Sequence, residues 1–193
     1  MARRGLDRKT VIERAARLAN ETGFSALSIK TLADALDVKS PSLYNHIGSL
    51  DELKRQLMLY GWRQISEQMI ESVAGVSGYD AIREICYAFY GYATENPGVF
   101  DAMFWYNKFE DEETKAVTDP LFSILYRITL SLGISRERCN HLIRTLRGFL
   151  EGFALLVNNR AFGNPISIRE SFELSVHVLI EGMKTLEEKE KRE

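Results

Sequence analysis

Apolar residues recur at helical spacing along most of the chain, and the pattern is clearest between residues 28 and 47. Ser28 stands where a side-chain hydroxyl caps the free backbone N–H groups at the start of a helix. The residues after it occupy positions i, i+3, i+4 and i+7, which form one buried helix face: Ile29, Leu32, Ala33 and Leu36. We therefore predict a short helix that begins after Ser28.

A second short helix of about two turns follows a break at residues 37–39. Ser40 is placed to cap it, and Pro41 fits its first position, where no backbone N–H is needed. Leu43 and Ile47 point inward. The outward face is polar and aromatic, with Ser42, Tyr44, Asn45 and His46. A short helix with such a face, held by a preceding helix, indicates a helix-turn-helix, whose second helix enters the major groove of DNA.

Helical patterns continue on both sides of this pair. A helix at residues 7–22 precedes it, and a long helix at residues 49–73 follows it, starting with a capping box in which Ser49 and Glu52 satisfy each other's backbone N–H groups. Pro120 marks a kink or break farther along the chain. Beyond the long helix the helical patterns cover residues 78–95, 96–107, 111–132, 135–162 and 167–188.

The sequence therefore predicts an all-α fold of about nine helices. Residues 1–50 form an N-terminal three-helix domain that contains the helix-turn-helix. The long helix joins this domain to a C-terminal helical bundle, within residues 51–193, for ligand binding and dimerisation.

Charge is distributed unevenly between the two parts. Residues 1–60 hold ten Lys and Arg against seven Asp and Glu, whereas residues 61–193 hold fifteen against twenty, which together give the net charge of −2. The basic excess coincides with the helix-turn-helix, as binding to DNA phosphates requires.

The stretch from Leu32 to Ile47, with Val38 to His46 at its centre, resembles the DNA-binding domain of the TetR (tetracycline-repressor) family of bacterial regulators. The turn at residues 21–24 fits as well, and the resemblance covers residues 7 to 60. The family usually has a phosphate-contacting lysine at the start of the fourth helix. Leu50 stands in that place, which argues against a phosphate contact there.

Eight residues are candidates for contact with DNA. Asn45 has the amide that pairs bidentately with adenine, and Ser42 suits a phosphate or a thymine methyl group. The resemblance implies that Tyr44 and His46 grip the DNA backbone and that Lys30 touches a base or a phosphate; the alternative for Tyr44 is partial packing under Ile47. The full set is Lys30, Lys39, Ser40, Pro41, Ser42, Tyr44, Asn45 and His46.

The second candidate site is a pocket for a small-molecule effector. Aromatic residues are dense between residues 86 and 109, and they form either a cavity or a solid core with a lid. Arg147 needs a partner, which is either Glu151 one turn away or an anionic ligand, and His141, Arg144 and Asn158 are further polar candidates. The predicted ligand-binding residues are Phe89, Tyr90, Phe100, Phe104, Trp105, Tyr126, Arg147 and Glu151.

The last two predicted helices, at residues 135–162 and 167–188, carry more apolar surface than terminal helices need. Either both faces pack within one monomer, or one face pairs with a second subunit in a four-helix bundle. We favour the homodimer, because helix-turn-helix proteins usually bind two half-sites. Residues 147–153 and 159–163 also resemble one class of TetR-family ligand and dimer domain.

Catalysis finds little support in the sequence. The three histidines lie in separate predicted helices without a metal-binding partner at i+4, and no glycine-rich phosphate loop is present. We expect no cofactor, no metal and no enzymatic activity. Cys86 and Cys139 are expected as buried, reduced thiols. The absence of a signal peptide and of a long apolar run indicates a cytoplasmic protein that does not enter the membrane.

These features predict a DNA-binding transcriptional regulator and, more specifically, a repressor. It would be released from a double-stranded, near-palindromic DNA operator when an apolar or amphipathic small molecule binds the C-terminal domain. Two alternatives stay open: an architectural DNA-binding protein without an effector, and a small all-α enzyme with a helix-turn-helix-like head.

Overall fold

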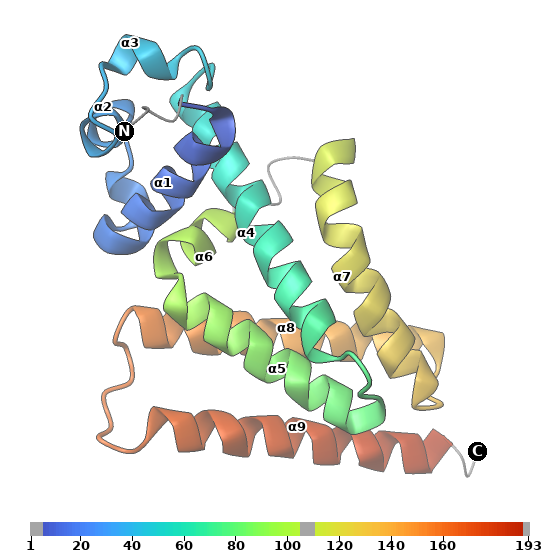
Figure 1. Ribbon diagram of the computed structural model, residues 1–193. Helices are drawn as coiled ribbons and strands as arrows, with labels where there is room; N and C mark the ends of the chain where they lie inside the picture. Colours follow the sequence, from blue (N-terminus) through green and yellow to red (C-terminus); the bar gives the residue numbers. More distant parts are fainter. Residues whose placement is uncertain (1–5, 105–110, 191–193) are drawn as a thin grey trace. The chain divides into compact units, whose positions relative to one another are not determined.

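The computed structural model describes residues 6–104 and 111–190, and every regular element in those ranges is helical (Figure 1). The prediction of an all-α fold is therefore confirmed. The α-helices are α1 (Arg8–Thr22), α2 (Ile29–Ala35), α3 (Ser40–Leu43), α4 (Leu50–Ser72), α5 (Gly78–Glu95), α6 (Pro97–Met103), α7 (Glu112–Ser131), α8 (Arg136–Asn158) and α9 (Ile168–Glu190). A short 3₁₀ turn, Phe24–Ala26, lies between α1 and α2.

The chain forms two compact units. The first, which we call the head unit, comprises Met1–Gln64 and Asn96–Val117, and the second, the body unit, comprises Ile65–Glu95 and Thr118–Glu193. Helices α4 and α7 each contribute residues to both units. The domain boundary that the sequence suggested at residue 50 stays a prediction.

Helix α1 is at the centre of the head unit, where it contacts both α2 and α6. Its start is fixed by Asp7, whose carboxylate accepts a hydrogen bond of 2.7 Å from the Thr10 N–H, and it ends at Gly23. Gly23 has a φ of 90°, which favours glycine, so the chain can turn there into α2. The buried face of α1 is made of Val11, Ala15, Ala16, Leu18 and Ala19.

A side-chain network attaches α6 to α1. The Asn20 amide donates to Asn96 Oδ1 at 2.9 Å, and its own Oδ1 accepts from the backbone N–H of Val99 at 3.0 Å. Asn96 occupies the N-cap position of α6, but its side chain makes no capping hydrogen bond and binds Asn20 instead.

Helix α5 packs against both α8 and α9 in the body unit (Figure 1). The centre of this packing is Phe172 of α9, which is fully buried. Its ring stacks on Tyr90 at a centroid distance of 4.2 Å and on Phe149 at 5.7 Å, and it meets Phe153 edge-on at 5.4 Å. Aromatic rings from three helices therefore form a continuous packed cluster.

The structure corrects some details of the predicted elements. Helix α3 has a single turn, and Ser40 is its first residue rather than its cap. Helix α7 continues through Pro120, so of the kink or break expected there the break is excluded and the kink stays a prediction. Helix α8 ends at Asn158, four residues early, because Asn159 caps it and Arg160 adopts a left-handed φ of 52°.

Candidate DNA-binding and effector sites

Helices α2 and α3 contact each other in the head unit and form a compact helix-turn-helix. The start of α2 is closed by a reciprocal pair: the Thr31 N–H donates to Ser28 Oγ at 3.1 Å, and the Ser28 N–H donates to Thr31 Oγ1 at 3.0 Å. After α2 the chain reverses at Asp37, which has a φ of 53°. The N–H of Val38 then donates to the carbonyl of Ala33 at 3.1 Å. These local bonds fix the angle at which α3 leaves α2.

The second helix is anchored by its apolar residues. Leu43 and Ile47 are fully buried, and the N–H groups of His46 and Ile47 both donate to the Leu43 carbonyl, at 2.9 and 3.0 Å. The turn after α3 is therefore part of the same rigid piece. Tyr44 lies between these anchors and is 54% exposed, so about half of its surface is open to solvent.

The predicted DNA-binding residues form one group in the chain. Seven of them lie in α3, at its N-cap or in the turn that follows, while Lys30 lies on α2. The exposed members are Lys30, Lys39, Pro41, Tyr44 and Asn45. Ser40, Ser42 and His46 are half-buried. The exposed members offer two cations, an amide and an aromatic hydroxyl, which suits contacts to phosphates and base edges.

The segment after α3 is held to α1. The Glu52 N–H donates to Ser49 Oγ at 3.0 Å, as expected for a capping box. The second hydrogen bond of the capping box differs from the prediction. The Glu52 carboxylate accepts it from the Gly48 N–H, at 2.7 Å, rather than from the Ser49 N–H. The same carboxylate also accepts from Arg8 of α1 at 2.8 Å.

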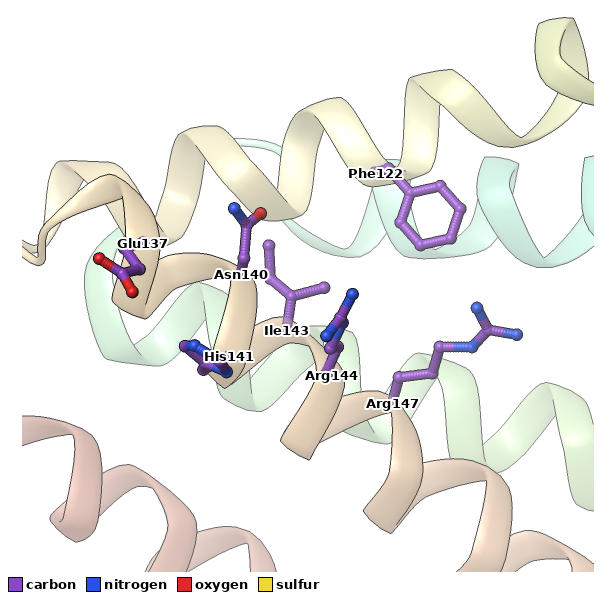
Figure 2. Close-up of a pocket in the computed structure, with 7 residues that line it drawn as sticks. All are labelled: Phe122, Glu137, Asn140, His141, Ile143, Arg144 and Arg147. Carbon is purple, nitrogen blue, oxygen red and sulfur yellow. The ribbon is translucent and has the colours of Figure 1, made fainter.

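A groove with a volume of about 560 Å³ lies between α7 and α8 in the body unit (Figure 2). Phe122 reaches into it from α7, and the other side chains come from α8. Arg147 is one of them, and its Nε donates to Glu151 Oε1 at 2.6 Å. The lining residues are Phe122, Glu137, Asn140, His141, Ile143, Arg144 and Arg147.

The other predicted ligand-binding residues do not line this groove. In the body unit, Phe89 is buried, Tyr90 stacks on Phe172 in the aromatic cluster, and the Tyr126 ring lies 5.4 Å from the Arg136 guanidinium. Burial also raises the pKa of Tyr90. Asn158 is engaged as well, because its amide donates to the Ala93 carbonyl at 3.0 Å.

The remaining aromatic candidates belong elsewhere. Phe100 and Phe104 are in the head unit, where their rings meet edge-on at 5.1 Å. Trp105 lies outside the described residues. The sequence analysis missed four lining residues, although the positions of His141, Arg144 and Arg147 already indicated a polar face on α8: Phe122, Glu137, Asn140 and Ile143.

Residues 6–104 and 111–190 contain no group of three His, Cys, Asp or Glu side chains that could hold a metal ion. None of the helices described there has the length and apolar content needed to span a bilayer.

An exposed recognition helix in a helix-turn-helix, joined to an all-helical body, defines a DNA-binding transcriptional regulator of the helix-turn-helix class. Two family models match the chain: "Bacterial regulatory proteins, tetR family" at residues 11–59, and "Tetracyclin repressor-like, C-terminal domain" at residues 82–179. The protein belongs to the TetR family of transcriptional regulators, as the sequence predicted.

Individual relatives agree with this assignment. The chain is 31% identical over 180 residues to the uncharacterized HTH-type transcriptional regulator YobS of Bacillus subtilis (strain 168), and the match covers 93% of each protein. A possible TetR family transcriptional regulator from Streptomyces coelicolor A3(2) superposes with a TM-score of 0.74 at 15% identity, covering 93% of this chain and 100% of that one. A TetR variant from Acinetobacter baumannii AYE, crystallised with minocycline, gives a TM-score of 0.73 at 20% identity, covering 95% and 99% of the two chains. At these identities the two solved structures show a shared fold.

Proposed function

We propose that the protein is a homodimeric repressor that binds a near-palindromic DNA operator and leaves it when a small molecule binds the body unit. The observation that carries the DNA-binding part of this proposal is the exposure of Tyr44 and Asn45 between two fully buried anchors, Leu43 and Ile47. Such an arrangement presents polar groups to a groove without loss of core packing.

Recognition divides between two kinds of contact. Tyr44, Lys39 and Lys30 grip phosphates, which supplies affinity but no sequence information. Asn45 pairs with an adenine edge in the major groove and selects sequence at one base pair. Two subunits place two recognition helices in successive major grooves, about 34–36 Å apart.

The dimer is supported by apolar surface on α8, on α9 and on the segment between them. Leu174 and Val178 of α9 are 63% and 60% exposed and stand one turn apart. The other exposed apolar residues of this surface are Leu155, Leu156, Phe162, Ile166 and Ile168. Apolar side chains exposed in this way cost free energy in water, and burying them against the same side chains of a second copy removes that cost.

The groove between α7 and α8 is the proposed effector site. It combines two apolar side chains, Phe122 and Ile143, with polar side chains along α8 that can orient a ligand. The A. baumannii variant with the same fold was crystallised with minocycline, which supports a ligand-binding role for the body. Release requires that the effector bind more tightly to a state in which the heads no longer match the operator. Helices α4 and α7 carry the change, because each has residues in both units.

Fluorescence anisotropy with labelled duplexes tests the proposal. Duplexes from upstream of the regulator's own gene are compared with random sequence at two salt concentrations. We expect tight, salt-dependent binding of one near-palindromic fragment by two subunits. Asn45→Ala is expected to relax the choice of one base pair, at a cost of about 1–3 kcal/mol, whereas Tyr44→Ala weakens binding to every duplex.

The matched control is Glu71→Ala, an exposed residue of α4 in the body unit, which should leave DNA binding unchanged. Equal, weak affinity for all duplexes, with no effect of either head variant, would refute a sequence-specific regulator.

A further inference from the structure

We propose that the groove between α7 and α8 selects an anionic amphipath, a small molecule with a carboxylate and an apolar ring, and that Arg144 binds the carboxylate. This inference rests on the proposed function, because it names the chemical class of the effector for that same groove.

The charges of the groove single out Arg144. Arg147 is already neutralised, because its guanidinium forms an ion pair of 2.6 Å with Glu151 and both side chains are half-buried. Arg144 lies one turn earlier on α8 and is exposed. Over residues 6–104 and 111–190 it makes no ion pair. Among the described residues, no carboxylate is therefore paired with the Arg144 guanidinium.

The acidic residue of the groove lies at its far end. Glu137 precedes Arg144 by seven residues on α8, which is about 10 Å along the helix axis. Figure 2 shows Glu137 at one end of the row of side chains and Arg147 at the other. An anionic group beside Arg144 thus avoids the Glu137 carboxylate, while a hydrogen-bond donor on the ligand can meet Glu137 or Asn140.

Two apolar side chains of the groove can contact the ring of the ligand. Phe122 projects from α7 toward the part of α8 that bears Arg144 and Arg147, and Ile143 lies beside Arg144 (Figure 2). A ligand ring against Phe122 and Ile143 leaves its carboxylate in reach of the Arg144 guanidinium. A planar guanidinium binds a carboxylate through two parallel hydrogen bonds, which a neutral amide cannot reproduce.

Isothermal titration calorimetry on the full chain tests this assignment, with 4-phenylbutyrate and its neutral isostere 4-phenylbutanamide as probes. The amide keeps the ring and the chain of the acid, but its head group is neutral and has an NH2 donor in place of one carboxylate oxygen. We expect the acid to bind at least about tenfold more tightly than the amide, which is the usual contribution of a charge-assisted hydrogen bond. Arg144→Gln should abolish this preference and leave the weaker affinity for the amide unchanged, and Arg144→Lys should restore part of it.

The matched control is Arg127→Gln, which removes an exposed cation of α7 that does not line the groove and should keep the preference for the acid. Equal affinity for acid and amide in the wild type, or an undiminished preference in Arg144→Gln, would overturn the inference.

The same preparations are assayed for DNA by anisotropy, so that the two proposals can fail separately. Specific DNA binding without binding of the acid overturns this inference and leaves the regulator standing. Binding of the acid through Arg144 without any specific DNA binding overturns the proposed function and leaves the assignment of the groove intact.

Discussion

Gly98 of α6 packs directly on the backbone of Ala19 in α1. A Cβ atom at position 98 would overlap the Ala19 carbonyl oxygen and would lie 2.7 Å from the backbone N of Asn20. Both neighbours are backbone atoms within a helix, so neither can move aside alone. Only glycine allows this approach, and the approach in turn lets Asn20 reach the Val99 N–H.

The first prediction follows from this contact. Gly98→Ala forces α6 away from α1 and should lower the free energy of unfolding by about 1–3 kcal/mol, the usual cost of overpacking. Urea denaturation followed by circular dichroism measures it. Gly91→Ala in α5 is the matched control, because a Cβ there meets nothing within 4 Å. It should stabilise the helix by about 0.5–1 kcal/mol. Equal effects of the two substitutions would contradict the close packing of Gly98 on the Ala19 backbone.

The second prediction concerns pH. Asp111 accepts from the Thr114 N–H at 2.8 Å and from Arg55 at 2.7 Å, and these bonds, that of Thr114 foremost, lower the pKa of its carboxyl from 3.8 to about 2. A lowered pKa means that the unfolded chain takes up the proton first as the pH falls. The stabilisation is therefore complete above about pH 4 and is lost as the pH falls toward about 2.

Asp111→Asn should remove this dependence. The difference in free energy of unfolding between wild type and variant should stay constant from neutral pH down to about 4 and shrink below it. Denaturant titrations at a series of pH values provide the measurement. Asp119→Asn, an exposed carboxylate on α7, is the control. If the difference in free energy of unfolding between wild type and Asp111→Asn grew as the pH fell, the Asp111 carboxylate would not stabilise the folded state in the way proposed.

The third prediction concerns the cysteines, which are both free and fully buried. Burial raises the pKa of Cys86 to about 12, so its thiolate is scarce at neutral pH. We expect native protein not to react with a disulfide reagent such as DTNB, and both thiols to react in concentrated guanidinium chloride. Rapid labelling of the native protein would mean that the helices around Cys86 and Cys139 open readily.

Local signals explain why most helices were predicted correctly. Ser28 caps α2 through bonds to a residue three positions away, and Gly78, with a φ of 64°, begins α5 where the sequence placed it. The end of α8 was misplaced for a related reason. The first glycine after it is Gly163, but the helix stops earlier through the Asn159 side chain, which donates to the Leu155 carbonyl at 2.8 Å. Asparagine is a weaker sequence signal than glycine.

The sequence predicted only part of the lining of the groove between α7 and α8. His141, Arg144 and Arg147 share a face of α8 by their spacing alone, whereas Phe122 joins them through the packing of α7 on α8, which no local pattern encodes. The partner of Arg147 could not be chosen from sequence either. An i, i+4 carboxylate and an external anion are both consistent with the spacing, and only the 2.6 Å contact selects Glu151.

The fourth prediction tests the proposed dimer. In a two-fold interface each residue is buried twice, so Leu174 and Val178 together contribute four side chains, each worth about 1.5–3 kcal/mol on burial. Glutamate at both positions places four charges in the same apolar surface. We expect Leu174→Glu with Val178→Glu to convert a dimer into a monomer and to weaken operator binding, because one recognition helix then binds alone.

Sedimentation equilibrium gives the mass, and circular dichroism checks that the fold is kept, since both residues are well exposed in the single chain. The control is Ser123→Glu with Arg127→Glu, an exposed pair at the same i, i+4 spacing on α7, which should leave the mass unchanged. A wild-type protein that sediments as a monomer, or a double variant of α9 that still sediments as a dimer, would mean that this apolar surface does not hold two subunits together. The operator would then have to be bound by a different assembly of the same heads.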